Sequence, residues 1–328
     1  MYCARTYQGN TRANSLAAAC IGAAFGLSGF PALAQDNNRD IAASQAHRQT
    51  GGACNLTTQL ALESCQRGVS SDFRLALGIC ANDSNPADRQ RCIQQAQQGK
   101  ADALQTCGAQ RAYRQGVCGG LGPSAYDPPI DPADFTTHID NPWFPLEPGT
   151  TFVYKVNDHT LIRTSVTYKT ITLAGVKCVV VHDQQSTDGV VEEDTFDYYA
   201  QDRKGNVWYF GDDTAEFTHG FPTSVEGAWR AGVNGAKPGI AMQAAPMLGE
   251  LYRQEFALGV AEDMAKVTGL HQSVRVPYGS FNALQTFEFT PLEPGAKENK
   301  YYAFGVGQVL SVDLVTGERD ELVRIEHH

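Results

Sequence analysis

The spacing of the cysteines most restricts how this chain can fold. Six of them lie between residues 54 and 118, separated by 11, 15, 12, 15 and 11 residues, which is a palindrome. The positions of the outer, middle and inner cysteines each sum to 172, so the series is centred on Pro86. Six cysteines allow about fifteen pairings. The symmetry favours the nested one: Cys54–Cys118, Cys65–Cys107 and Cys80–Cys92.

The residues between these cysteines favour helices. At about 100° per residue, steps of 11 and 15 return to within about 20° and 60° of one helix face. The arms are rich in Ala, Gln, Leu and Arg, which are good helix formers. The stretch NDSNP predicts a turn in which Asn85 or Ser84 caps a second helix that begins near Pro86. We therefore expect an antiparallel helical hairpin over residues 52–119. Metal binding is the alternative, but no C-x-x-C pair supports it.

The N-terminus predicts secretion. Arg5 and Arg12 precede an apolar run, Leu16–Phe30, and Ala32–Ala34 supplies a small-x-small cleavage site. We expect a signal peptide over residues 1–34 and a flexible segment over 35–51, with acylation of Cys20 as the alternative. The apolar run is too short for a stable membrane anchor, and no other segment is apolar enough to span a bilayer. A periplasmic or extracellular location also suits a disulfide-bonded hairpin.

The remainder of the chain reads as a β domain. A Pro- and Asp-rich connector covers residues 120–145, and short runs rich in Val, Thr, Tyr and Phe follow. Over residues 146–328 this pattern predicts an all-antiparallel β meander, curled into a barrel or half-barrel, so the chain is of the α+β class. The Gly- and Ala-rich segment 228–249 is expected to be a long ordered loop. Cys178 lies in an apolar run and is expected to be a buried free thiol.

The stretch EEDTFDYYAQDRKGNVWYFGDDT, residues 192–214, combines acidic and aromatic residues. It predicts a β-hairpin with Gly205 in a left-handed turn position, and its aromatics are first of all packing residues. A turn near residues 203–204 places residue 194 opposite residue 213. Four acids would then meet at the open end of the hairpin: Glu192, Asp194, Asp212 and Asp213. Calcium takes six to eight oxygens from such groups, so a calcium site is one hypothesis and a solvated hairpin is the other.

Other residues offer further candidate sites. Tyr199, Trp208 and Tyr252 are expected to line a ligand cavity. A transition-metal site is a second possibility, formed by histidines with nearby acids: His182, Asp183, His219 and His271. Glu193 and Asp197 could act as a carboxylate pair. The sequence carries no zinc-protease, serine-hydrolase, phosphate-loop or dinucleotide motif.

Several segments resemble a group of secreted bacterial β-rich proteins: NPWFPLEPGTTFVY, the acidic stretch above, and YYAFGVGQV. The resemblance covers most of the chain from residue 141 onward and implies secretion without implying a mechanism. The cysteine series is similar to the nested disulfides of small twin-cysteine helical hairpins in geometry alone.

Charge and composition leave three functions open. The formal net charge of −10 argues against nucleic acid as a partner. The first hypothesis is a secreted binding protein that holds a small ligand or cation on an acidic, aromatic-lined sheet face. The second is an envelope protein that docks to another protein through the helical hairpin. The third is a metal-dependent or carboxylate-based hydrolase.

Overall fold

The helical hairpin forms with the nested disulfides. The computed structural model describes residues 52–328, so the expected signal peptide and the segment 35–51 lie outside the described residues. Helices α2 (Gly52–Ala81) and α3 (Pro86–Leu121) run antiparallel. The disulfides Cys54–Cys118, Cys65–Cys107 and Cys80–Cys92 join them, with Cα–Cα distances of 5.7, 5.8 and 5.5 Å. The pairing predicted from the spacing is confirmed.

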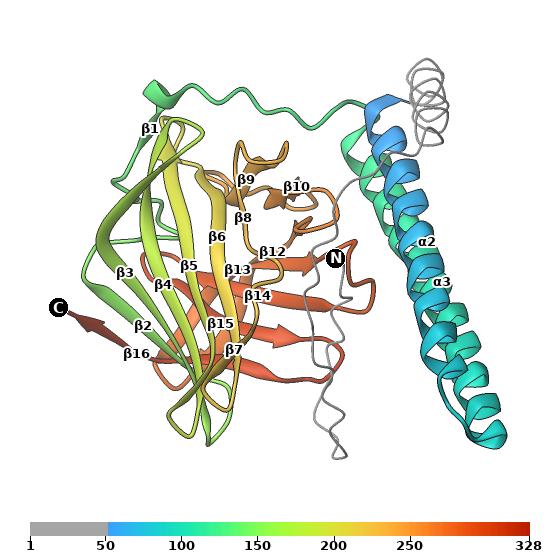
Figure 1. The fold of residues 1–328 in the computed structure, drawn as a ribbon. Helices are drawn as coiled ribbons and strands as arrows, with labels where there is room; N and C mark the ends of the chain where they lie inside the picture. The colour runs from blue at the N-terminus through green and yellow to red at the C-terminus, as the bar shows by residue number, and fades with distance from the viewer. Residues whose placement is uncertain (1–51) are drawn as a thin grey trace.

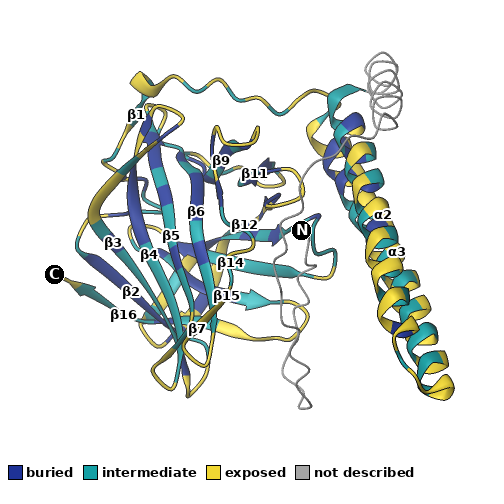
Figure 2. Cartoon of the chain, viewed as in Figure 1, coloured by how far each residue is buried: buried dark blue, intermediate teal, exposed yellow. Residues whose placement is uncertain are grey.

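Packing within the hairpin is concentrated at one end. At the turn, the Asn85 side chain caps α3 by accepting hydrogen bonds from the backbone amides of Ala87 and Asp88. Apart from the cysteines, few residues of the hairpin are buried. Most of the hairpin surface is exposed or half-exposed (Figure 2). The buried ones lie near the start of α2 and the end of α3: Leu56, Thr58, Leu62, Arg114 and Val117. The far half of the hairpin therefore depends on its two inner disulfides. Neither described helix is long and apolar enough to cross a membrane.

The β domain is built from strands joined mostly by short turns. In chain order they are β1 (Phe135–Thr136), β2 (Thr150–Lys155), β3 (Thr160–Leu173), β4 (Val176–Thr187), β5 (Val190–Asp202), β6 (Val207–Thr218), β7 (Phe221–Ser224), β8 (Trp229–Arg230), β9 (Lys237–Met242), β10 (Leu251–Arg253), β11 (Glu255–Phe256), β12 (Met264–Val276), β13 (Gly279–Phe289), β14 (Lys297–Ala303), β15 (Gly307–Asp313) and β16 (Arg319–His327). A short 3-10 turn, η1 (Pro132–Asp134), precedes β1. Every strand pairing is antiparallel, as the sequence predicts.

The sheet is nearly closed. Its order is β10-β12-β13-β14-β15-β16-β2-β3-β4-β5-β6-β9-β11, so the last strand pairs with β2 near the start of the domain. Strands β9 and β10, which belong to opposite ends of this order, are in contact. Figure 1 shows the long strands β2–β6 on one side and β12–β15 crossing behind them. The curled sheet therefore encloses an interior.

Two hydrophobic clusters lie on opposite faces of the sheet. The inner one includes Phe152, Val181 and Leu284. The outer one covers β4–β6, where the Pro-rich connector contributes Phe135, whose ring lies 5.5 Å from that of Phe210. Cys178 is fully buried in this outer cluster as a free thiol, as predicted.

The segment 228–249 departs from its prediction. It contains β8 and β9 and is not a single long loop. A Cβ added at Gly239 in β9 would lie 2.3 Å from the backbone carbonyl carbon of Gln254. Glycine is needed there because two backbones approach closely. The glycine content that suggested a loop is thus a requirement of strand packing.

Candidate functional site

A β-bulge in β6 decides which acids face the interior. Tyr199 pairs with Tyr209, and Asp197 pairs with Asp212, so β6 contains one more residue than β5 between the two pairs. Gly211 lies in this bulge with a φ of 125°. The extra residue reverses the alternation of side chains. Asp212 consequently faces the interior, whereas Asp213 faces outward.

The predicted register of this hairpin was wrong by two residues. Asp194 pairs with Ala215, and Asp213 pairs with Phe196. The turn forms with Gly205 at a φ of 89°, but the pair Gln201–Val207 centres it on residue 204, which accounts for one residue of the difference. The bulge accounts for the other. The bulge could not be inferred from the alternation of polar and apolar residues, because Asp212 and Asp213 are identical and adjacent.

Replacing Gly211 by alanine is expected to be much more damaging than an ordinary glycine substitution. An added Cβ would lie 2.2 Å from the Trp229 carbonyl oxygen. Backbone strain and overpacking together should lower the free energy of unfolding by roughly 3 kcal/mol or more. Gly189→Ala is the control, since Gly189 also has a positive φ but has open space around it, and should lose roughly 1–2 kcal/mol. Urea denaturation measures both, and equal losses would show that the bulge is not constrained by the Trp229 contact.

The four acids proposed for calcium do not come together. Asp212 lines the interior, whereas Asp194 bonds to His182 at 2.6 Å and Asp213 pairs with Arg230. The exposed Glu192 accepts from Thr187 at 2.9 Å. The remaining acids of this set therefore have partners of their own. Within residues 52–328, no three His, Cys, Asp or Glu side chains are arranged to hold a metal ion.

The histidines are likewise dispersed. His182 stacks on Phe196 with ring centroids 4.5 Å apart. His219 lies in the turn between β6 and β7, His271 lies on β12, and both are exposed. The hydrogen bonds from His182 and Gln184 outweigh the effect of burial and hold the pKa of Asp194 below its ordinary value. His182 and Asp194 therefore form a local hydrogen-bonded pair on the outer face.

The interior of the sheet is a cavity of about 2350 Å³ that extends to the hairpin. Its walls are strongly acidic. The carboxylates contributed by the β domain include Asp183, Glu193, Asp197, Asp212, Glu255, Asp263, Glu288, Glu298, Asp313 and Asp320. Only three basic side chains are among the described residues that line it: Arg114, Lys297 and Lys300. The cavity thus favours positive charge.

A row of carboxylates crosses three adjacent strands. Asp183 on β4, Asp197 on β5 and Asp212 on β6 line the same wall. The Tyr209 hydroxyl lies 2.6 Å from Asp197 and 3.0 Å from Asp212, within hydrogen-bond distance of both carboxyl groups. Thr164 donates to Asp183. Across residues 52–328, the structure gives Asp183 and Asp197 these hydrogen bonds but no ion pair.

The pKa values of Asp183 and Asp197 are unusual. Burial, together with neighbouring carboxylates, raises the pKa of each to about 7: Asp197 acts on Asp183, and Asp212 acts on Asp197. Near neutral pH these two carboxyl groups are therefore partly protonated. A positive charge placed between them would reverse that effect.

Lys300 shows how the cavity treats an ammonium group. Its Nζ lies 2.9 Å from Glu288 and 3.0 Å from Glu298. Ser311 supports Glu298 with a hydrogen bond of 2.7 Å, and Thr286 supports Glu288 with one of 2.8 Å. Although burial opposes its charge, these carboxylates raise the pKa of Lys300 well above its ordinary value. The ion pairs of Lys300 are with Glu288 and Glu298, and its charge also acts on Asp197, whose pKa it lowers.

Aromatic rings lie beside the carboxylate row. Tyr199 stacks on Tyr209 with centroids 5.0 Å apart, and Phe144 lies 5.5 Å from Tyr199. Of the three ring residues predicted to line the cavity, Tyr199 does so. Trp208 instead packs on the outer face against Phe135, and Tyr252 lies in the inner hydrophobic cluster.

Sequence reasoning missed Tyr209 and Lys300 as residues of the cavity. The alternation of Glu298, Lys300 and Tyr302 along one face of β14 is a signal that could have found Lys300.

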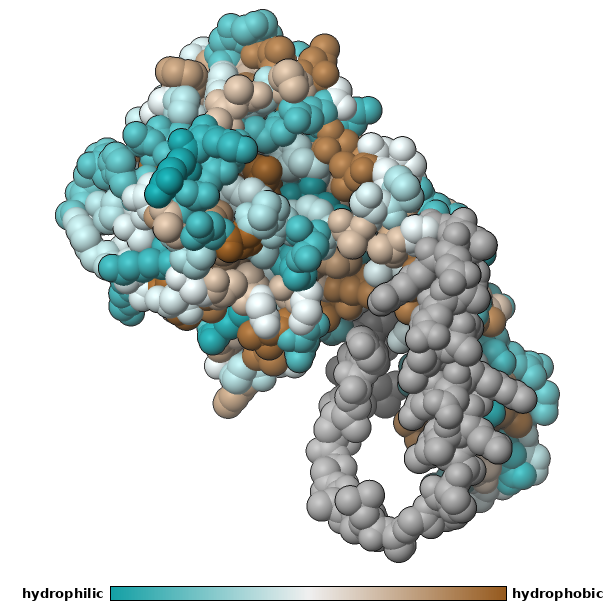
Figure 3. All heavy atoms as spheres, turned by 90° about the horizontal axis from the view of Figure 1, so that it is seen from above, coloured by the Kyte–Doolittle hydropathy of each residue, from teal (hydrophilic) through white to brown (hydrophobic). Residues whose placement is uncertain are grey.

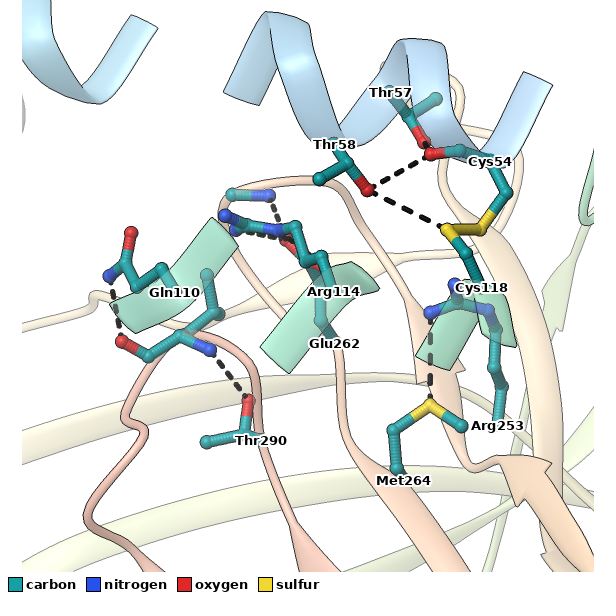
Figure 4. Close-up of polar contacts among 12 residues, drawn as sticks. Cys54, Thr57, Thr58, Gln110, Arg114, Cys118, Arg253, Glu262, Met264 and Thr290 are labelled. Atoms are coloured by element: carbon teal, nitrogen blue, oxygen red, sulfur yellow. Dashed lines mark hydrogen bonds and ion pairs between the residues drawn. A yellow bond between two sulfur atoms is a disulfide. The ribbon is translucent and has the colours of Figure 1, made fainter. Parts of the chain in front are cut away.

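The helical hairpin forms the remaining wall of the cavity. Figure 4 shows Arg114 of α3 reaching Glu262, where Nε and Nη2 donate to the carboxylate at 2.9 and 2.7 Å. Gln110 donates to the Leu292 carbonyl at 2.7 Å. These contacts hold the last turns of α3 on the β domain, so that one face of α2 looks into the cavity.

Comparisons with known proteins add little. No protein-family model and no curated protein matches the chain. Among solved structures, a crystal structure of a putative lipoprotein from Parabacteroides distasonis ATCC 8503 is similar at 10% identity with a TM-score of 0.32, covering 56% of this chain and 98% of that one.

Proposed function

We propose that the protein is a secreted or periplasmic binding protein whose cavity holds an organic cation bearing ammonium groups. The observation that carries the proposal is the pair Asp183 and Asp197, which share a cavity wall, have pKa values near 7 and lie in no ion pair within residues 52–328. An ammonium group bound between them would offset their mutual repulsion and their burial.

An organic cation fits this cavity better than a metal ion. Calcium needs six to eight closely placed oxygens, whereas the described carboxylates line the wall of a space of about 2350 Å³. Small-molecule pockets typically measure about 300–1000 Å³, so this larger space has room for an organic molecule. The rings of Tyr199 and Tyr209 offer faces for cation–π contacts, and Lys300 is an ammonium group that the same interior already stabilises.

Spermidine, a flexible polyamine, is a suitable probe. We expect isothermal titration calorimetry at pH 7.5 to show saturable binding. The double substitution Asp183→Asn/Asp197→Asn should weaken it by about 10- to 100-fold, since each charge-assisted contact contributes about 1.5–3 kcal/mol. Glu192→Gln is the matched control. Glu192 lies on β5, as Asp197 does, but it is exposed and does not line the cavity.

The control should bind spermidine as the unchanged protein does. Absence of spermidine binding would contradict the proposal. So would equal weakening by Glu192→Gln, because the attraction would then be a general effect of net charge.

Docking through the hairpin is an alternative function. Leu75 and Ile79 lie one turn apart on α2 and are 67% and 66% exposed. Two side chains form a smaller surface than the several hundred Å² that mark an interaction site.

A carboxylate-based hydrolase is the second alternative, because two carboxyls with a pKa near 7 would suit general acid–base catalysis.

A further inference from the structure

The hairpin is fixed to the β domain at its base. There, α3 places Arg114 against Glu262 and Gln110 against the Leu292 carbonyl. Farther along α3, the side chains that line the cavity become more accessible: Arg114 is buried, Gln110 is half-buried and Asp102 is exposed. Helix α2 has 30 residues and is about 45 Å long, so a rotation of about 10° at the base would move the tip by about 8 Å. The hairpin therefore has the geometry of a hinged lid beside the cavity.

The hairpin faces loops of chemistry similar to its own. The α2 residues that line the cavity recur at spacings of four from Leu60 to Asp72, which keeps them on one helix face. The hairpin side of the cavity combines apolar and acidic side chains: Leu60, Val69, Asp72 and Asp102. The loops between the strands of the β domain do the same: Val225, Glu226, Glu293 and Val315. Figure 3, a view from above, likewise shows apolar and hydrophilic side chains mixed over the described surface.

Charge on the two sides opposes closure. Asp72 and Asp102 on the hairpin have the same sign as Glu226 and Glu293 on the loops, so they repel each other. The basic side chain of these loops, Lys297, lies near the base of the hairpin, over a ring of α3. Repulsion between exposed charges extends over about 30 Å in ~10 mM salt and about 3 Å in ~1 M salt. The described position of the hairpin therefore suits conditions in which these acids are not neutralised.

Apolar side chains on the two sides favour closure. Val225 and Val315 are each 69% exposed, and Leu60 is 39% exposed. Packing of the α2 face against the loops would remove part of this surface from water, which is favourable. The balance between the two positions is thus decided by the charges.

We infer that the hairpin is a lid that like charge holds open and that closes onto the loops of the β domain when cations neutralise the acids on the two sides. The lid turns about its base, where Arg114 and Glu262 stay paired. This inference does not rest on the proposed function, because salt alone should close the lid.

Double electron–electron resonance between two spin labels measures the closure in the full disulfide-bonded chain with Cys178→Ala. One label replaces Ser84 in the hairpin turn, and the other replaces Val190 on the β domain. Between about 10 mM and about 1 M salt, we expect the mean distance to shorten by at least ~5 Å. Asp72→Asn/Asp102→Asn should give the short distance already in about 10 mM salt. A label pair at Lys177 and Val190, within the β domain, should not change.

The matched control is Glu63→Gln/Asp88→Asn, which removes the same charge from hairpin residues that do not line the cavity. It should keep the long distance in low salt. A distance that stays the same in salt and in Asp72→Asn/Asp102→Asn would overturn the lid and leave the cation-binding function standing. Equal shortening in the control would also overturn it, because the effect would then come from the net charge of the hairpin.

Discussion

Reduction of the three disulfides is expected to unfold the helical hairpin while the β domain stays folded. The crosslinks close segments of 64, 42 and 12 residues, and each typically stabilises a protein by about 2–4 kcal/mol. Few side chains within the hairpin are buried, so it has little other stabilisation. The hydrophobic clusters of the β domain contain no disulfide.

Circular dichroism measures this result. After reduction the helical signal in the far ultraviolet should fall, whereas the near-ultraviolet signal of the buried tyrosines should persist. Cys65→Ser/Cys107→Ser should reproduce part of the loss. Cys178→Ala, which removes a thiol but no crosslink, should retain the full helical signal. Retention of that signal after complete reduction would contradict the account of how the hairpin is held.

Glu262→Gln is expected to lower the free energy of unfolding by about 3–5 kcal/mol. The Arg114 and Glu262 side chains are only 7% and 2% exposed. Glu262 also accepts from the Gly259 amide at 2.8 Å. Removal of its charge leaves the Arg114 guanidinium buried without a carboxylate, which is far more costly than losing the pair as a whole.

The double substitution Arg114→Met/Glu262→Leu tests that reasoning. It removes both charges and should recover much of the stability lost in Glu262→Gln. Asp158→Asn, which breaks the exposed ion pair between Lys155 and Asp158, is the control and should leave the stability nearly unchanged, because water screens an exposed pair. Urea denaturation measures all three variants. A loss for Glu262→Gln as small as the control's would show that the pair does not hold the hairpin.

The hairpin and the class of the β domain were predictable because local features determine them. Cysteine spacing limits which helix faces can meet, and Asn85 with Pro86 marks the turn. Short β-rich runs separated by turn residues predict antiparallel neighbours. None of these inferences requires knowledge of contacts between distant parts of the chain.

The cavity was harder to predict because it depends on one bulge and on distant pairings. The extra residue at Gly211 brings Asp212 inward and sends Asp213 outward. Lys300 and Glu288 come from strands about a hundred positions after the carboxylate row, so closure of the sheet alone brings them to the same interior. The acidic stretch was correctly expected to form a hairpin, but its side chains are divided between two faces.

The most direct test of the cavity's function is the proton release that accompanies spermidine binding. Titrations at pH 6.5 in two buffers of different ionisation enthalpy measure it. Alkylammonium groups have pKa values of about 10 and stay charged, so any released proton comes from the protein. Because Asp183 and Asp197 have pKa values of about 7, they are partly protonated at this pH, and a bound cation should expel protons from them. We predict release that disappears in Asp183→Asn/Asp197→Asn, together with affinity that increases from pH 6 to pH 8. Binding without proton release would contradict a cation held at this carboxylate row.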